Sequence, residues 1–461
     1  MPTKIETIDR DTPMLLPPDM RDWVPEDDMV HFVIEAVERV GADTFALNTR
    51  GSGSAQKSPH MMLGLLIYCY SNGIFSSRRI ERATYRDVAV RYLTGDTHPD
   101  HDTICKFRRE NLQAVSVAFV EILQLAREVG VLKLGKVSTD GTHIKASAAM
   151  NQNIGYGRAV ELKAQLEQDI ASLLSQAEEA DRNGEDEQSL PEELARRSKL
   201  LSKMDEAIAG LKKRAEAEQV KERAEYEKKV AKRKRKARET GKKVTGKEPK
   251  APTRDIEDIA QQSKATHNLT DPASRVMRKS KHGAYTQSIN AQASVDAEGS
   301  FLILGQHLSQ NSGDFTELAR AYKAIPAVLG KPEAIIADAG FMNAEAFEEI
   351  AELGCEPYVS VSSENDHNQR GYEFRPPEKI KPPRNLTDPV LLAMKEKLKT
   401  DAGKAVYKLR SQTVETVFGI IKEVMGFRSF GLRGLEKMQG EWELVCMAYN
   451  CKRLHKMMQK V

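Results

Sequence analysis

Two aspartates stand at the ends of segments that predict β-strands. Asp140 ends the strand expected in VLKLGKVSTD, and Gly141 follows it directly. Asp338 ends the apolar run PEAIIAD and is followed by Ala339 and Gly340. Small residues at such positions let a substrate or a metal ion approach the backbone closely. Both carboxylates are therefore candidate metal ligands, and the alternative is that each aspartate only forms a turn or a cap.

A third carboxylate, Glu415, lies on a helix expected in SQTVETVFGIIKEVMG. It sits beside the apolar stripe of this helix, and Lys422, two turns later, shares its face. Three convergent carboxylates suit Mg²⁺, which prefers carboxylate, water and phosphate oxygens. Two such ions can stabilise the attacking and leaving oxygens of an in-line displacement at phosphorus. The alternative for Glu415 alone is a solvated surface charge.

The elements that must position these carboxylates predict a central sheet covered by helices. After residue 250 the order is strand, strand, helix, strand, helix, strand, helix, and a first strand lies in residues 133–157. This order is typical of an α/β fold with a mixed sheet. Loops are expected at residues 51–54 and 375–385, where Gly-Ser and Pro-rich segments occur.

Two further parts of the chain predict helices alone. Residues 1–132 show apolar residues at helical spacing and form an expected N-terminal helical domain. Residues 158–250 are rich in Ala, Glu, Lys, Leu, Arg and Gln and contain two apolar stripes, with a break at 184–191. They predict a helical hairpin or a short antiparallel coiled coil that ends in a basic, poorly ordered tail. This insertion separates residues 133–157 from 251–461 within the expected α/β domain.

Composition limits the class of protein. Of the 461 residues 30% are charged, yet the formal net charge is only +3, so local clusters matter more than the total. Five scattered cysteines argue against a disulfide framework and for a reducing compartment. No secretion signal and no apolar run of about 18 residues occur. We expect a cytoplasmic protein without a membrane partner.

Seven segments, in order along nearly the whole chain, resemble bacterial insertion-sequence transposases of the DDE class. They are LLPPDMRDWVP, DHDTICKFRREN, STDGTHIKA, NLTDPASRVM, GAYTQSINAQASVD, IIADAGF and YKLRSQTVETVFGIIKEVMGFRSFGLRG. The resemblance implies a ribonuclease H-like catalytic domain, interrupted here by the insertion and preceded by the helical domain. It also implies that Asp140, Asp338 and Glu415 form the catalytic triad and bind two Mg²⁺ ions, with Mn²⁺ as a substitute.

The last of these segments also resembles the Y-R-E-K signature of such enzymes. Tyr407, Arg410, Glu415 and Lys422 are the matching residues, and the step from Arg410 to Glu415 is one residue longer than in the pattern. The resemblance implies that the basic residues of this signature contact DNA phosphates. For Lys422 the alternative is a surface lysine.

Other basic residues are candidates for DNA contact. The helix expected in DTICKFRREN would present Lys106, Arg108 and Arg109 outward, in a loose match to a helix-turn-helix, or be only a solvated face. Further phosphate candidates are Lys145, Arg428 and Arg433. The insertion carries a dense basic block, which is either a solvated linker or an arm that neutralises DNA phosphates. This block comprises Lys232, Arg233, Lys234, Arg235, Lys236 and Arg238.

Three functions fit these observations to different degrees. The first is a transposase that cleaves phosphodiesters at transposon ends and joins the 3′-hydroxyls to target DNA, acting as a homo-oligomer on double-stranded DNA in the bacterial nucleoid. The second is a catalytically silent, transposase-derived DNA-binding repressor. The third is a coiled-coil scaffold, for which residues 158–250 are too short and too firmly embedded. The intact set of three acidic residues favours the enzyme.

Overall fold

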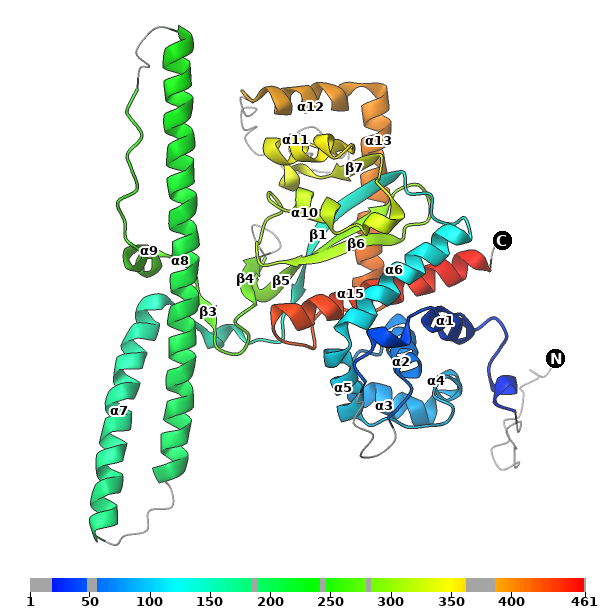
Figure 1. Cartoon of the computed structure of the whole chain (residues 1–461), viewed down its shortest axis with the longest axis horizontal. Helices are drawn as coiled ribbons and strands as arrows, with labels where there is room; N and C mark the ends of the chain where they lie inside the picture. Colours follow the sequence, from blue (N-terminus) through cyan, green and yellow to red (C-terminus); the bar gives the residue numbers. More distant parts are fainter. Residues whose placement is uncertain are drawn as a thin grey trace, which may run out of the picture.

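The computed structural model describes residues 19–47, 56–183, 190–240, 246–278, 283–361 and 386–459 (Figure 1). The loops expected at residues 51–54 and 375–385, and most of the helix break expected at 184–191, lie outside these ranges.

Helices fill the first part of the chain, in agreement with its apolar periodicity. The segment HMMLGLLIYCY lies in α2 (Pro59–Ser71), which is buried on nearly all sides because apolar residues occur all round it. The Ser58 hydroxyl caps this helix and accepts a hydrogen bond from the Met61 N–H. The neighbouring helices are α1 (Met29–Glu38), α3 (Ser77–Arg86), α4 (Val88–Leu93), α5 (His101–Glu110) and α6 (Leu112–Glu128).

A six-stranded mixed sheet forms the centre of the second part. Its strands are β1 (Lys136–Lys145), β4 (Arg275–Arg278), β5 (Tyr285–Asp296), β6 (Ile303–Ser309), β7 (Ala334–Ala337) and β8 (Glu356–Val359). The strand order is β6-β5-β1-β7-β8, with β4 and β6 on successive stretches of the same edge of β5. Strand β1 is antiparallel to β5 and parallel to β7, so the sheet is mixed as expected.

Helices cover both faces of this sheet. Ala291 and Ala293 of β5 belong to a core shared with the N-terminal helices and with α15 (Leu435–Met458). The Trp442 indole N–H of α15 donates to the Gln292 carbonyl oxygen at 3.0 Å. A second core joins Ile335 of β7 to α10 (Leu318–Lys323), α11 (Ala344–Glu352) and α12 (Pro389–Lys399).

The helix expected in SQTVETVFGIIKEVMG is divided into pieces. Helix α13 (Asp401–Gln412) ends before Thr413, whose φ of −108° and ψ of −88° are not helical. Helix α14 (Val414–Gly419) then leads directly into a π-helical turn (Ile420–Val424). The break lies between Arg410 and Glu415, where the spacing is one residue longer than in the signature.

The insertion forms a helical hairpin at one side of the molecule (Figure 1). Helix α7 (Tyr156–Asn183) packs along α8 (Leu190–Thr240), which continues well beyond it. Two short strands, β2 (Asn153–Ile154) and β3 (His267–Asn268), pair at its base, and α9 (Ile256–Gln262) packs on α8. The basic block lies in α8, so the expectation of poor order is wrong for the block itself, because Ala, Lys, Arg and Glu all favour helix.

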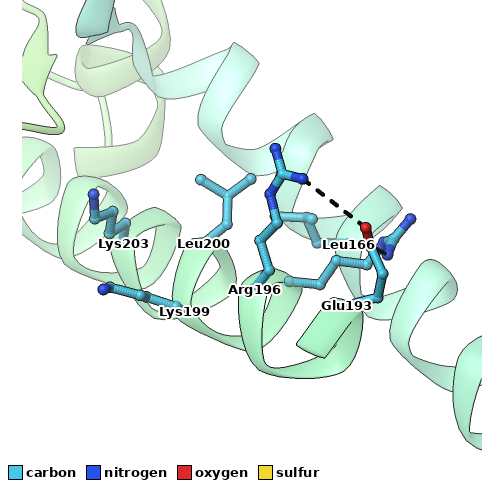
Figure 2. A pocket seen from close by; sticks show the side chains of 7 residues that line it. Leu166, Glu193, Arg196, Lys199, Leu200 and Lys203 are labelled. Atoms are coloured by element: carbon cyan, nitrogen blue, oxygen red, sulfur yellow. Dashed lines mark hydrogen bonds and ion pairs between the residues drawn. The ribbon is translucent and has the colours of Figure 1, made fainter. Parts of the chain in front are cut away.

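The hairpin also carries a shallow hollow where α7 and α8 meet. Leu166 and Leu200 form its apolar floor, and Arg196, Lys199 and Lys203 are among the residues that surround it (Figure 2). All of its lining residues belong to the two helices, so the hollow is separate from the carboxylates at the sheet. Within the described residues no helix is both long and apolar enough to cross a membrane.

Candidate active site

Asp140 lies near the middle of β1, opposite Ala293 of β5. Its carboxylate accepts a hydrogen bond from the Gly141 N–H at 2.7 Å and is 18% exposed. Burial and the nearby charge of Asp338 raise the pKa of Asp140 to about 7. The positive charge near this carboxylate is therefore too small to offset the cost of its burial.

Asp338 lies at the end of the parallel neighbour strand. Ser138 of β1 is in register with Ile336 of β7, so two residues further along each strand are Asp140 and Asp338. Asp338 begins a 3-10 turn, and its Oδ1 accepts a hydrogen bond from the Gly340 N–H at 2.7 Å. The parallel register of β1 and β7 thus brings Asp140 and Asp338 together, whereas the prediction that Asp140 ends its strand is wrong, because β1 continues to Lys145.

Glu415 is connected to Asp140 by Arg410, which contacts both carboxylates. Arg410 is buried, and its Nη1 lies 3.2 Å from Glu415 Oε1 and 3.9 Å from Asp140 Oδ2. The same guanidinium lies over the Tyr407 ring, 6.0 Å from the ring centroid. Arg410 therefore links two of the three predicted carboxylates.

The three predicted ligands do not converge on one point. Within the part of the chain that the structure describes, no group of three or more His, Cys, Asp or Glu side chains could hold a metal ion. Asp140 and Asp338 nevertheless fit a hard divalent cation, because each raises the energy of the other's charged form and both offer oxygen ligands. Glu415 is 53% exposed and is paired with Arg410.

Lys422 lies against the strand that carries Asp140. Its Nζ donates to the Thr142 hydroxyl oxygen at 2.5 Å and to the His143 carbonyl oxygen at 3.1 Å. Thr142 is two residues after Asp140, and side chains two apart in a strand share a face. Lys422 is therefore on the same side of β1 as Asp140.

The residues after the π-helical turn run along the end of β1. The Arg433 Nε donates to the Ser147 carbonyl oxygen at 2.8 Å, and Arg428 forms an ion pair with Glu423. Lys145, the last residue of β1, is exposed. Lys145, Arg428 and Arg433 thus lie at or next to the end of the strand that carries Asp140. Their contact with DNA phosphates stays a prediction.

In α5 the structure corrects one predicted DNA contact. Arg108 is buried, and its Nη1 donates to the Tyr70 hydroxyl at 2.6 Å and lies 3.8 Å from Glu441 Oε1. The prediction that Arg108 faces outward is wrong, because Arg108 follows Ile104 by four residues and shares its buried face. Lys106 and Arg109 are exposed, as predicted.

The basic block of the insertion lies far along α8. Arg233 donates to the carbonyl oxygens of Gly246 at 3.0 Å and Lys247 at 3.1 Å. Lys234, Arg235 and Arg238 lie on the same stretch, and the side chains of Lys232 and Lys236 are outside the described set. Nearby, Lys228 Nζ lies 2.5 Å from Glu345 Oε1, so α8 contacts α11 of the sheet domain.

A fourth carboxylate, Asp314, was not predicted. Its Oδ1 accepts hydrogen bonds from the Asn290 amide at 2.8 Å and the Gln292 amide at 2.5 Å. A Cβ at Gly141 would lie 2.2 Å from Gln292 Nε2 and 2.5 Å from Asp314 Oδ1. Gly141 is thus needed because these side chains occupy its face of the sheet. The signal available in the sequence was an aspartate in the loop that follows the strand predicted over 301–307, in NSGDFTEL.

The strand order, the mixed strand directions and the two aspartates on neighbouring strands define a ribonuclease H-like α/β domain. A family model described as a transposase DDE domain matches residues 260–451. A second, described as transposase domain (DUF772), matches residues 18–110. The chain belongs to the insertion-sequence transposases of the DDE class. No curated protein and no solved structure matches it significantly.

The matched residues leave out the first aspartate. Asp140 precedes residue 260, and the insertion lies between it and the DDE-domain match. The pairing of β1 with β5 and β7, and the contact of Arg410 with Asp140, join this aspartate to the matched part of the chain. The geometry therefore supplies a connection that the family match does not contain.

Proposed function

We propose that this transposase cleaves phosphodiesters at the ends of its own element and joins the released 3′-hydroxyls to target DNA. The observation that carries the proposal is the position of Asp140 next to Asp338 on neighbouring strands, where burial and then the charge of Asp338 raise the pKa of Asp140. Two carboxylates held together in this way favour a divalent cation over solvent.

In this proposal Asp140, Asp338 and Glu415 would hold two Mg²⁺ ions, for which Mn²⁺ is a substitute, and Glu415 would have to exchange its contact with Arg410 for a cation beside the two aspartates. Bound there, the ions would supply charge stabilisation for the attacking and leaving oxygens at phosphorus. No protein nucleophile is required, because water and then a DNA hydroxyl attack. The chain's own contribution is to fix the positions of the ligands and to bind the phosphates on either side.

Three other residues are proposed to orient these groups. Arg410 holds Asp140 and Glu415 through its guanidinium, and Tyr407 packs on Arg410. Lys422, fixed by Thr142, is proposed to hold a phosphate next to the scissile bond as a point charge. The protein is proposed to act on double-stranded DNA as a homo-oligomer, since two ends must be joined.

Removal of single carboxylates tests this proposal. Asp140→Asn, Asp338→Asn and Glu415→Gln should each lower the rate of end cleavage about a thousandfold or more, corresponding to roughly 4 kcal/mol in the transition state. Binding of a duplex that carries the DNA flanking the gene should persist. Asp255→Asn is the matched control, because Asp255 only caps α9 and asparagine caps equally well.

The outcomes separate the enzyme from the alternative. A variant that nicks the flanking duplex at the wild-type rate in Mg²⁺ would not have lost a catalytic ligand. A wild-type protein that binds the duplex but does not cleave it in Mg²⁺ or Mn²⁺ would instead be a catalytically silent repressor.

A further inference from the structure

Helix α3 carries an arginine face that its surroundings do not neutralise. Arg78, Arg79, Arg82 and Arg86 are all exposed. Within the described ranges, none of the four takes part in an ion pair or a side-chain hydrogen bond. The only acidic residue of α3 is Glu81. It contacts His101 instead, with Oε2 2.8 Å from Nδ1.

The four arginines share one side of the helix. Positions 78, 82 and 86 follow at steps of four residues, and position 79 lies three before 82, so all four are neighbours on the helix surface. The opposite side carries the buried residues Ile80, Ala83 and Thr84. From residue 78 to residue 86 the helix rises about 12 Å. The major groove of B-DNA is also about 12 Å wide.

Part of this face is concave. A shallow hollow is lined by Ile74, Arg79, Arg82, Ala83, Arg86 and Asp87. Its one acidic residue, Asp87, caps α4 by accepting a hydrogen bond from the Val90 N–H at 3.1 Å. Three guanidinium groups around a hollow favour a phosphate, because each can donate two parallel hydrogen bonds.

Contacts in the core fix α3 relative to the carboxylates. The Phe75 ring, in the turn before α3, lies 5.2 Å from the Phe427 ring. The segment of Phe427 then pairs with β1, where the Phe430 N–H donates to the Lys145 carbonyl oxygen at 2.8 Å. Strand β1 carries Asp140, so the arginine face and the carboxylates belong to one packed unit.

Helix α5, which was expected to contact DNA, has less exposed and unneutralised positive charge than α3. Arg108 is buried. The exposed charges that remain are Lys106 and Arg109, and they are balanced on the same helix by Asp102 and Glu110. The exposed side of α5 therefore has no net charge.

We propose that the arginine face of α3, rather than α5, binds the transposon-end duplex, with the helix in or along the major groove. The inference rests on the proposed function, because that function supplies the duplex as the substrate. Charge complementarity selects DNA: double-stranded DNA carries one negative charge per ~1.7 Å of its axis.

Two double variants of the full chain, each with two positive charges removed, test the proposal. Arg82→Gln/Arg86→Gln alters α3, and Lys106→Gln/Arg109→Gln alters α5. The probe is a fluorescent duplex with the DNA flanking the gene, titrated at several salt concentrations. Each lost phosphate contact should lower the slope of log affinity against log salt by about 0.9, so the α3 variant should lose about 1.8. The α5 variant should keep the wild-type slope and affinity.

The outcomes distinguish this inference from the proposed function. The inference would be overturned if the α3 variant kept the wild-type affinity and salt slope, or if only the α5 variant lost affinity. In either case, cleavage of the duplex by the wild-type protein would still support the proposed function. If the wild-type protein neither binds nor cleaves the duplex, the proposed function fails, and the inference fails with it. Circular dichroism and thermal melting of both variants verify that the exposed substitutions leave the fold unchanged.

Discussion

The Asp140 carboxyl group determines how the site responds to pH. Its raised pKa of about 7 results first from burial and then from the charge of Asp338, while the Gly141 N–H and Arg410 act in the opposite direction. A raised pKa means that the proton is still bound near neutral pH. A cation can bind only the deprotonated carboxylate, so proton and cation compete for the same group.

We therefore expect the affinity for Mn²⁺ to fall as the pH is lowered through about 7, by about tenfold per pH unit below that value. The sign follows from the direction of the shift: above pH 7 the ligand is already charged, and below it a proton must first leave. Calorimetric titration with Mn²⁺ at a series of pH values measures this dependence. An affinity that is constant from about pH 5.5 to pH 8 would contradict it, given the usual range of aspartate pKa values.

Sequence patterns predicted the elements better than the contacts between them. The strands of Asp140 and Asp338 were predicted because β-branched and apolar runs end at small residues. The break at Thr413 could not be predicted, because the apolar stripe of Val414, Val417 and Phe418 continues the helical period. The helix is interrupted at Thr413 by its packing against the rest of the molecule, which the sequence of this segment alone does not reveal.

In the site, too, the contacts between distant segments were not predicted. Asp314 is near Asp140 because β5 places Gln292 opposite Gly141, and this pairing joins residues about 150 positions apart. Arg108 was assigned to DNA because it is basic and lies on a helix that follows another helix. Its position four residues after Ile104 placed it on the packing face, and its buried partners Tyr70 and Glu441 come from distant helices.

The far end of α8 gives a prediction for a single element. Replacing Lys232, Arg233, Lys234, Arg235, Lys236 and Arg238 by Gln should keep the helix, because Gln, Lys and Arg have similar helix propensities. If the block neutralises phosphates, affinity should fall for every DNA sequence, and the salt slope should flatten by up to about 5. The choice of ends should not change.

Salt titration of the block variant on flanking and unrelated duplexes measures both effects. Lys199→Gln/Lys203→Gln is the control, because these lysines lie near the other end of the same helix. An unchanged slope in the block variant would show that the block is only a solvated part of the arm.

At the scale of the whole molecule, the N-terminal helices are packed into the rest of the chain. Helices α2 and α6 both pack on α15, and one hydrophobic core includes residues of all three. At this junction Glu441 lies 3.8 Å from Arg108 and accepts hydrogen bonds from the Gly431 and Leu432 N–H groups at 2.9 Å each. The boundary predicted at residue 132 therefore separates segments that share a core.

Removing Arg108 should destabilise the entire fold. Arg108→Met leaves Glu441 buried without its cationic partner, and loss of one partner of a buried pair costs about 3–5 kcal/mol. The matched control is Arg109→Met, the exposed neighbour on the same helix, which should change the free energy of unfolding by no more than about 0.5 kcal/mol. Urea denaturation of the full chain measures both, and equal stabilities of the two variants would contradict a structural role for Arg108.

The packing of α15 against α2 and α6 also sets the order of events during synthesis. Helices α2 and α6 leave the ribosome first, but α15, which covers part of their apolar faces, is translated only after the insertion and the strands of the sheet. Until then these helices lack part of their core and the Glu441 partner of Arg108. If the arginine face of α3 binds DNA as proposed, its position relative to Asp140 becomes fixed only after α15 has been synthesised, so a growing chain would not hold a transposon end in register with its carboxylates.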